Sequence, residues 1–370
     1  MPHSIASCGL IPGILLLVFS GLLSIFGLYL LSRCASLCRP ARSASFALLA
    51  KMTYPRASIG FDSAIAIKCA GVACSYLIII GSLMPSVILS FDRHPPAWLL
   101  DRGLWIVAST SILTPLCYSR QLHSLRFTSY ISLLVVFDLI LVVVYKFCTR
   151  APLPPSSPTH VFVLDTSIVS SIPVYIFAFT CAQNLFSCFN ELTKNGQKRM
   201  NAVTGISIGS ATLIYELIGV LAYLTFGAEV PSNVMTAYHD SLFVNICRAG
   251  IVIFILFSYP LQILPCRASL SHLFNSPDTP FKHVLLTTFI LLLTFLIAMN
   301  VTELALVMGI IGSTGSTTVS FILPSLFYLK LFPDNEWKGV RILARALFVM
   351  GFVIMFACLG VVIYHGVTGH

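Results

Sequence analysis

The sequence predicts an all-α integral membrane protein, and three observations support that prediction. Only 9% of the 370 residues are charged, against about 25% in a soluble globular protein. Hydrophobic residues make up 57% of the chain, and the mean hydropathy is +0.92. The apolar residues are gathered in runs long enough to cross a bilayer, which takes about 20 residues in a helix. Lipid must therefore solvate most of the surface of the folded chain.

Ten apolar runs are candidate membrane-spanning helices. They cover residues 11–32, 62–90, 103–119, 125–146, 167–190, 202–226, 242–266, 283–300, 304–329 and 342–365. A stretch of ten residues precedes the first run and is too short to span a bilayer.

The basic residues predict an orientation. Sixteen of the 22 Lys and Arg side chains lie in one alternate set of loops, beginning with the loop after residue 32, and four lie in the other set. Because cytosolic loops are enriched in Lys and Arg, the first set is expected to be cytosolic. This distribution explains the formal charge of +9 without a nucleic-acid partner. Of the cations inside runs, Lys68 is near one end, and snorkelling toward the membrane surface explains it.

Polar residues inside the runs are candidate functional residues, because lipid excludes unpaired polar groups. Thr180, Cys181, Gln183 and Asn184 follow Pro173 in the middle of the fifth run. They predict a discontinuous helix whose freed backbone groups face a cavity. A seam of hydrogen bonds to a neighbouring helix is the alternative interpretation.

A run of small residues, 309–318 (GIIGSTGSTT), lies inside the ninth apolar run. Small residues favour close packing of helices. The second interpretation is that Gly312 and Ser313 approach a central cavity.

Three residues are candidates for coupling to an ion. Asp138 and Glu216 lie near the centres of their runs, so each must be protonated, paired or beside water. A proton relay and a structural hydrogen bond are both compatible with each of them. Ser258 precedes Pro260 and Pro265, which free backbone carbonyls inside a helix. These groups predict either a small-cation site or a plain kink.

Several chemical classes are excluded by the motifs. The chain contains no GxSxG or HExxH motif and no GxGxxG motif after a strand. The 12 cysteines form no CxxC pair and no Cys/His set with zinc spacing. The sequence therefore predicts neither an enzyme, nor a metal site, nor a cofactor.

Several segments resemble one membrane protein family. The fifth run, with FAFTCAQNLF at 177–186 and FNEL at 189–192, resembles the sixth helix of the amino acid/auxin permease family, and most of all its fungal vacuolar branch. Residues 219–227, 258–267 and 309–324 resemble that family's seventh, eighth and tenth helices. Residues 11–33 and 65–84 resemble its second and third helices. The likeness covers essentially the whole chain.

The resemblance implies a LeuT-type inverted-repeat transporter fold, with ten full transmembrane helices plus the remnant of a first helix. The chain 1–370 would be a single, N-terminally truncated domain. Residues 1–10 would be the outer half of helix one, 11–146 the rest of the first repeat, 167–330 the second repeat and 341–366 an appended last helix. The family's Gly-rich unwound stretch of helix one would precede Met1. Ala182 stands where many relatives have histidine.

The implied function is secondary active transport of neutral or basic amino acids by alternating access. Protons are the expected coupling ion and sodium the alternative, and the protein would act as a monomer in the vacuolar membrane rather than the plasma membrane. The implied substrate-site residues are Thr180, Cys181, Gln183, Asn184, Gly312 and Ser313, and Ser258 corresponds to a sodium-contacting position. Two other interpretations stay open: a non-transporting amino acid sensor, and an inactive truncated gene product.

Overall fold

The computed structural model describes residues 1–40, 42–91, 94–118, 125–150, 157–163, 167–192, 196–273, 279–332 and 338–368. The longer helices in this part of the chain are α1 (Pro2–Cys8), α2 (Leu10–Ala35), α3 (Phe46–Thr53), α4 (Ser58–Phe91), α5 (Arg102–Tyr118), α6 (Leu125–Arg150), α7 (Ser167–Ala178), α8 (Ala182–Glu191), α9 (Gln197–Phe226), α10 (Leu242–Leu273), α11 (Pro280–Asn300), α12 (Leu304–Ile311), α13 (Leu323–Leu331) and α14 (Lys338–Thr368). The shorter helical turns are η1 (Pro55–Ala57), η2 (Ala97–Leu100), η3 (Gly227–Glu229), η4 (Val234–Thr236), η5 (Gly312–Ser316) and η6 (Thr318–Ile322).

The predicted all-α membrane fold is confirmed in the described residues. Nine helical segments there are long and apolar enough to cross a membrane, and they match nine of the ten predicted runs. The remaining run forms α5, a helix of 17 residues, somewhat shorter than the roughly 20 that a perpendicular span needs. The run at 167–190 is broken into α7 and α8, and the run at 304–329 passes through two π-helical turns, η5 and η6.

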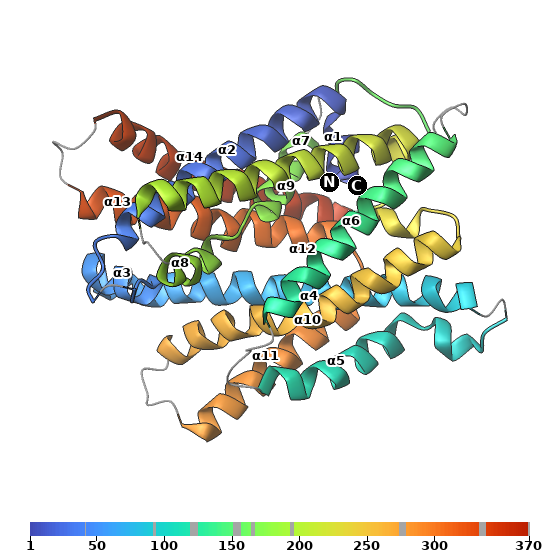
Figure 1. The fold of residues 1–370 in the computed structure, drawn as a ribbon, viewed down its shortest axis with the longest axis horizontal. Coiled ribbons are helices and arrows are strands. Elements are labelled where there is room, and N and C mark those ends of the chain that lie inside the picture. The colour runs from blue at the N-terminus through green and yellow to red at the C-terminus, as the bar shows by residue number, and fades with distance from the viewer. Residues whose placement is uncertain are drawn as a thin grey trace.

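The helices pack in a layered bundle (Figure 1). The two long helices α4 and α10 lie side by side through the middle and share the most extensive interface in the described chain. Helix α2 packs along α9 on one side of this pair, and α5 and α11 pack on the other. Helix α6 crosses both α9 and α10. The short α1 fits against α2, α7 and α9, and thus lies next to the broken helix.

Contacts between loops agree with the two faces that the charge pattern predicts. Ala44, in one loop of the Lys/Arg-rich set, is hydrogen-bonded to Asn190, at the end of the run 167–190 that leads into another loop of this set. Two positions from the other set also meet, because the Arg102 guanidinium donates to the carbonyl of Val301 over 2.7 Å. Arg93, Arg120 and Lys194, which also entered the charge count, lie outside the described residues.

Glycine permits very close approach where the small-residue segment meets its neighbours. A Cβ atom at Gly312 would lie 2.0 Å from the carbonyl oxygen of Pro173 on α7. A Cβ atom at Gly27 on α2 would lie 2.2 Å from the carbonyl oxygen of Ser320 on η6. Both distances are far inside van der Waals contact, so these positions require glycine. Close packing of backbones, the favoured interpretation of the segment 309–318, is therefore what the structure shows.

Candidate functional site

The break between α7 and α8 is the centre of the candidate site. Helix α7 ends at Ala178, residues 179–181 are not helical, and α8 begins at Ala182. A broken helix leaves carbonyl groups without their usual partners, and inside a membrane protein other groups must satisfy them. The Ser24 hydroxyl on α2 donates to the Phe179 carbonyl over 2.9 Å. The Tyr215 hydroxyl on α9 donates to the Ala178 carbonyl over 3.4 Å, so both neighbouring helices hold the break in place.

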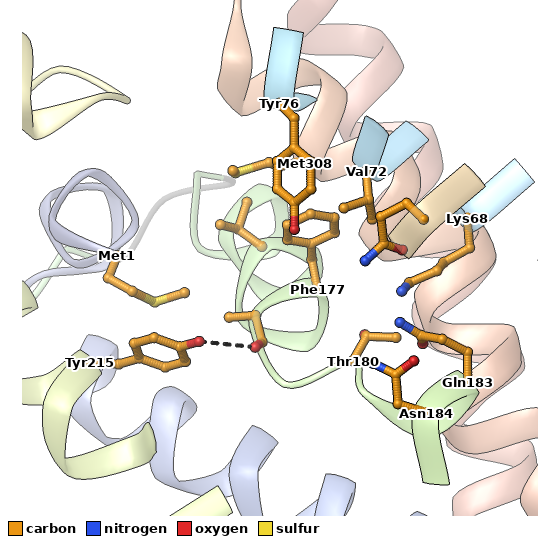
Figure 2. A pocket seen from close by; sticks show the side chains of 13 residues that line it. Met1, Lys68, Val72, Tyr76, Phe177, Thr180, Gln183, Asn184, Tyr215 and Met308 are labelled. Carbon is orange, nitrogen blue, oxygen red and sulfur yellow. Dashed lines mark hydrogen bonds between the residues drawn. The ribbon is translucent and has the colours of Figure 1, made fainter. Parts of the chain in front are cut away.

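A cavity of about 360 Å³ lies beside this break, which is within the range of about 300–1,000 Å³ typical of small-molecule sites. Figure 2 shows its lining side chains converging from several helices. The lining residues are Met1, Lys68, Val72, Tyr76, Val174, Phe177, Ala178, Thr180, Gln183, Asn184, Tyr215, Gln262 and Met308. The cavity is thus polar on the side of the break and apolar on the side of α7 and α12.

The structure brings three of the predicted substrate-site residues together in this cavity. Thr180, Gln183 and Asn184 all line it. The Thr180 hydroxyl donates to the Ile176 carbonyl over 2.7 Å, which adds a third hydrogen bond at the broken helix. Cys181 is the residue that precedes α8 and is half-buried between these lining residues.

Gly312 and Ser313 lie behind the lining rather than in it. Gly312 packs on the main chain of Pro173. Ser313 is fully buried, and its hydroxyl donates to the carbonyl of Gly309 over 2.8 Å, one turn earlier in its own helix. Gly312 therefore supports α7 from outside the cavity.

Two side-chain oxygens of the lining residues have unused hydrogen-bonding capacity. The Oε1 atoms of Gln183 and Gln262 are buried and lack a hydrogen-bond partner within the described part of the chain. A buried acceptor left unpaired costs about 1–3 kcal/mol. Both oxygens are covered by protein atoms, so a bound molecule would recover that cost only after the side-chain amides turn toward the cavity.

Sequence reasoning missed four of the polar lining residues, Lys68, Tyr76, Tyr215 and Gln262. The expectation that Lys68 snorkels is wrong, because its side chain is 2% exposed and lines the cavity. The available signal was that Lys68 and Gln262 are polar residues inside apolar runs. Which way they point depends on how α4 and α10 are rotated about their axes, and the packing of the two helices decides that.

The candidate ion-coupling residues lie at different distances from the cavity. Glu216 follows the lining residue Tyr215 on α9, and its Oε1 atom is buried without a hydrogen-bond partner among the described residues. Ser258 is buried on α10, one turn before Gln262 and on the same face. Asp138 on α6 contacts the Cys247 thiol on α10. Glu216 and Ser258 are thus near cavity-lining residues along α9 and α10. Asp138 lies instead in a contact between α6 and α10.

A discontinuous helix with a polar cavity at its break, inside a bundle of membrane-spanning helices, is the arrangement found in secondary transporters. The protein therefore falls in the class of polytopic membrane transport proteins. Comparison with known families specifies this class: the model of the transmembrane amino acid transporter protein family matches residues 1–365. The chain belongs to that family, whose members are transporters rather than enzymes.

Individual relatives cover nearly the whole chain. Vacuolar amino acid transporter 5 of Schizosaccharomyces pombe is 38% identical over 98% of this chain and 89% of its own length. Vacuolar amino acid transporter 5 of Saccharomyces cerevisiae is 32% identical over 100% of this chain and 95% of its own. Sodium-coupled neutral amino acid symporter 2 of Danio rerio is 26% identical over 98% and 78% of the two chains.

Solved structures are more distant. A mutant of the manganese transporter of Eremococcus coleocola aligns over 99% of this chain and 91% of its own, with a TM-score of 0.49 and 11% identity. A Na⁺-coupled sialic acid symporter aligns over 98% and 88% of the two chains, with a TM-score of 0.40 and 11% identity.

Proposed function

We propose that the protein is a secondary active transporter that carries an amino acid through the cavity at the α7–α8 break by alternating access. One observation carries the proposal: Thr180, Gln183 and Asn184 present polar side chains to a cavity of about 360 Å³ inside an otherwise apolar bundle. Membership of an amino acid transporter family supports the substrate class. The names of the yeast relatives support the vacuolar membrane as its location, which a fluorescent fusion would test against a vacuolar marker.

The geometry supports a movement of α8 during transport. Because residues 179–181 are not helical, α7 and α8 can change their relative angle without disrupting a continuous helix. The cavity residues Gln183 and Asn184 lie in the first turn of α8, so movement of α8 would open the cavity and shift its ligand contacts together.

Uptake into proteoliposomes tests this function directly. Purified protein should accumulate radiolabelled amino acid when a pH gradient is imposed. Gln183→Ala and Asn184→Ala should each raise the KM by about two- to tenfold, since a neutral hydrogen bond contributes about 0.5–1.5 kcal/mol. Asn300→Ala, which removes an exposed amide at the end of α11, is the matched control and should leave the KM unchanged.

Absence of flux for every amino acid, with or without a gradient, would refute the proposal. Binding without flux would indicate a sensor instead.

We further propose that protons drive this transport through Glu216. An ionised carboxylate held in the membrane without a partner is costly, and the Oε1 atom of Glu216 is buried without one among the described residues. Glu216→Gln removes the exchangeable proton and keeps the shape. This variant should lose uptake driven by a pH gradient while retaining exchange of amino acid across the membrane.

Asp138→Asn is the comparison for that experiment, because Asp138 contacts Cys247 at the α6–α10 interface and not the cavity. It should retain gradient-driven uptake. Glu216→Gln with full pH-dependent accumulation, or dependence of uptake on sodium alone, would contradict proton coupling through Glu216.

A further inference from the structure

Lys68 places a charged group in the lining of the cavity. Figure 2 shows its side chain reaching from α4 toward Gln183 and Thr180. It lies ten residues after Ser58, the first residue of α4, and its side chain is enclosed by the helix bundle and not turned toward the membrane surface.

The backbone around Lys68 is held firmly. A Cβ atom at Gly315 on η5 would lie 2.6 Å from the Lys68 Cβ and 2.9 Å from its Cα. The glycine therefore allows η5 to press directly on α4 at this residue. With its main chain packed in this way and its side chain 2% exposed, Lys68 has the cavity as the space into which its ammonium group can extend.

The charge of Lys68 has no counter-charge in the described structure. Lys68 is the one charged side chain among the described lining residues, and neither an ion pair nor a hydrogen bond is formed by it within that part of the chain. Asp62, on the same helix, does not supply a counter-charge, because its Oδ1 atom lies 3.6 Å from Nδ1 of His272. A buried ammonium without an anion is costly, so an anionic ligand group would be bound strongly at this point.

We propose that Lys68 binds a carboxylate of the transported amino acid and thereby selects substrates by charge, an inference that rests on the function proposed above. The ammonium group of Lys68, in the lining of the cavity, pairs with that carboxylate. The same positive charge repels a cationic side chain, so we expect neutral and acidic amino acids as substrates, in place of the neutral or basic ones that the family resemblance implies.

Competition binding to purified protein, with uptake measured in parallel, tests this assignment. The variants are Lys68→Met, which removes the charge at similar length, and Lys68→Arg, which keeps it. Lys51→Met removes an exposed lysine from α3 and is the matched control. Thermal unfolding of each variant shows whether it is folded. The ligands are glutamine, glutamate and γ-aminobutyrate, because they separate the α-carboxylate from a side-chain carboxylate.

Lys68→Met should weaken binding by about tenfold or more, the loss expected for a charge-assisted hydrogen bond. Loss for glutamine and glutamate assigns the contact to the α-carboxylate, and loss for glutamate and γ-aminobutyrate assigns it to the side-chain carboxylate. Lys68→Arg should retain most of the affinity, and Lys51→Met all of it.

Unchanged affinity of folded Lys68→Met for all three ligands would overturn the assignment. The wild-type protein gives an independent measurement if Lys68→Met does not fold: binding lysine as tightly as glutamine would also overturn it. Both results leave amino acid transport itself intact, whereas a wild-type protein that neither binds nor moves any amino acid would refute the proposed function.

Discussion

The side-chain amide of Asn190, near the end of α8, is hydrogen-bonded on both sides to the main chain of Ala44. The N–H group of Ala44 donates to Oδ1 over 3.1 Å, and Nδ2 donates to the carbonyl of Ala44 over 2.9 Å. Close by, the rings of Phe46 and Phe186 meet edge to face with centroids 4.8 Å apart. Helix α8 therefore lines the cavity at one end and is fastened at the other to the loop before α3.

Asn190→Ala should release this end of α8. Loss of both hydrogen bonds leaves the main-chain groups of Ala44 unpaired, and each unpaired buried group costs about 1–3 kcal/mol. We expect a lower midpoint of thermal unfolding in detergent and a changed KM, because α8 also carries Gln183 and Asn184. Asn190→Asp keeps the acceptor and loses the donor, so its effect on stability should be intermediate. Equal stability of Asn190→Ala and the wild type would show that the fastening contributes nothing.

Gly312→Ala should destabilise the fold strongly. The new Cβ atom would lie 2.0 Å from the Pro173 carbonyl oxygen, so a backbone must shift, and overpacking of this kind costs about 1–3 kcal/mol or more. The shift would displace α7 and with it the break at the cavity. We expect loss of both thermal stability and transport, measured on the same preparation.

Gly205→Ala provides the control for this substitution. A Cβ atom at Gly205 on α9 would have no described atom within 4 Å, and alanine is the better helix former. Its stability should equal or exceed that of the wild type. Gly312→Ala with wild-type stability would contradict the close approach of η5 and α7.

Arg248→Met should destabilise the segment that precedes α10. The Arg248 side chain is 1% exposed and donates to the carbonyls of Met235 and Tyr238 and to the side chains of Asp240 and Asn245. Each carbonyl left unpaired costs about 1–3 kcal/mol. Thermal unfolding can be followed with a thiol-reactive dye, since nine of the cysteines are buried and become reactive on unfolding. Arg199→Met, at an exposed position of α9, should leave the unfolding midpoint unchanged, and equal midpoints for the two variants would refute the role of Arg248.

Hydropathy predicted the spans well, because each span must be apolar along its whole length whatever its neighbours are. The break at 179–181 was also predictable, since Thr180, Gln183 and Asn184 at mid-depth require a polar surrounding. The direction of Lys68 was not predictable, because a lysine ten residues into a helix can either snorkel or point inward. The close approach of Gly315 to α4 decides between these, and it joins residues nearly 250 positions apart. Gly312 likewise packs on Pro173, a residue far away in the sequence. The sequence alone therefore did not distinguish a packing role for Gly312 from a place in the cavity lining.

Cys181 offers a direct measurement of whether the cavity is occupied. It lies between the lining residues Thr180 and Gln183 at the start of α8 and is half-buried. We expect a saturating amino acid substrate to slow its alkylation by a small maleimide, because a ligand in the cavity blocks the approach to the thiol. The experiment uses a background in which the exposed cysteines Cys148 and Cys188 are replaced by serine. Cys181→Ala in this background should abolish the substrate-sensitive labelling, which identifies its position. Labelling of Cys181 at the same rate with and without substrate would place the bound amino acid elsewhere than at the α7–α8 break.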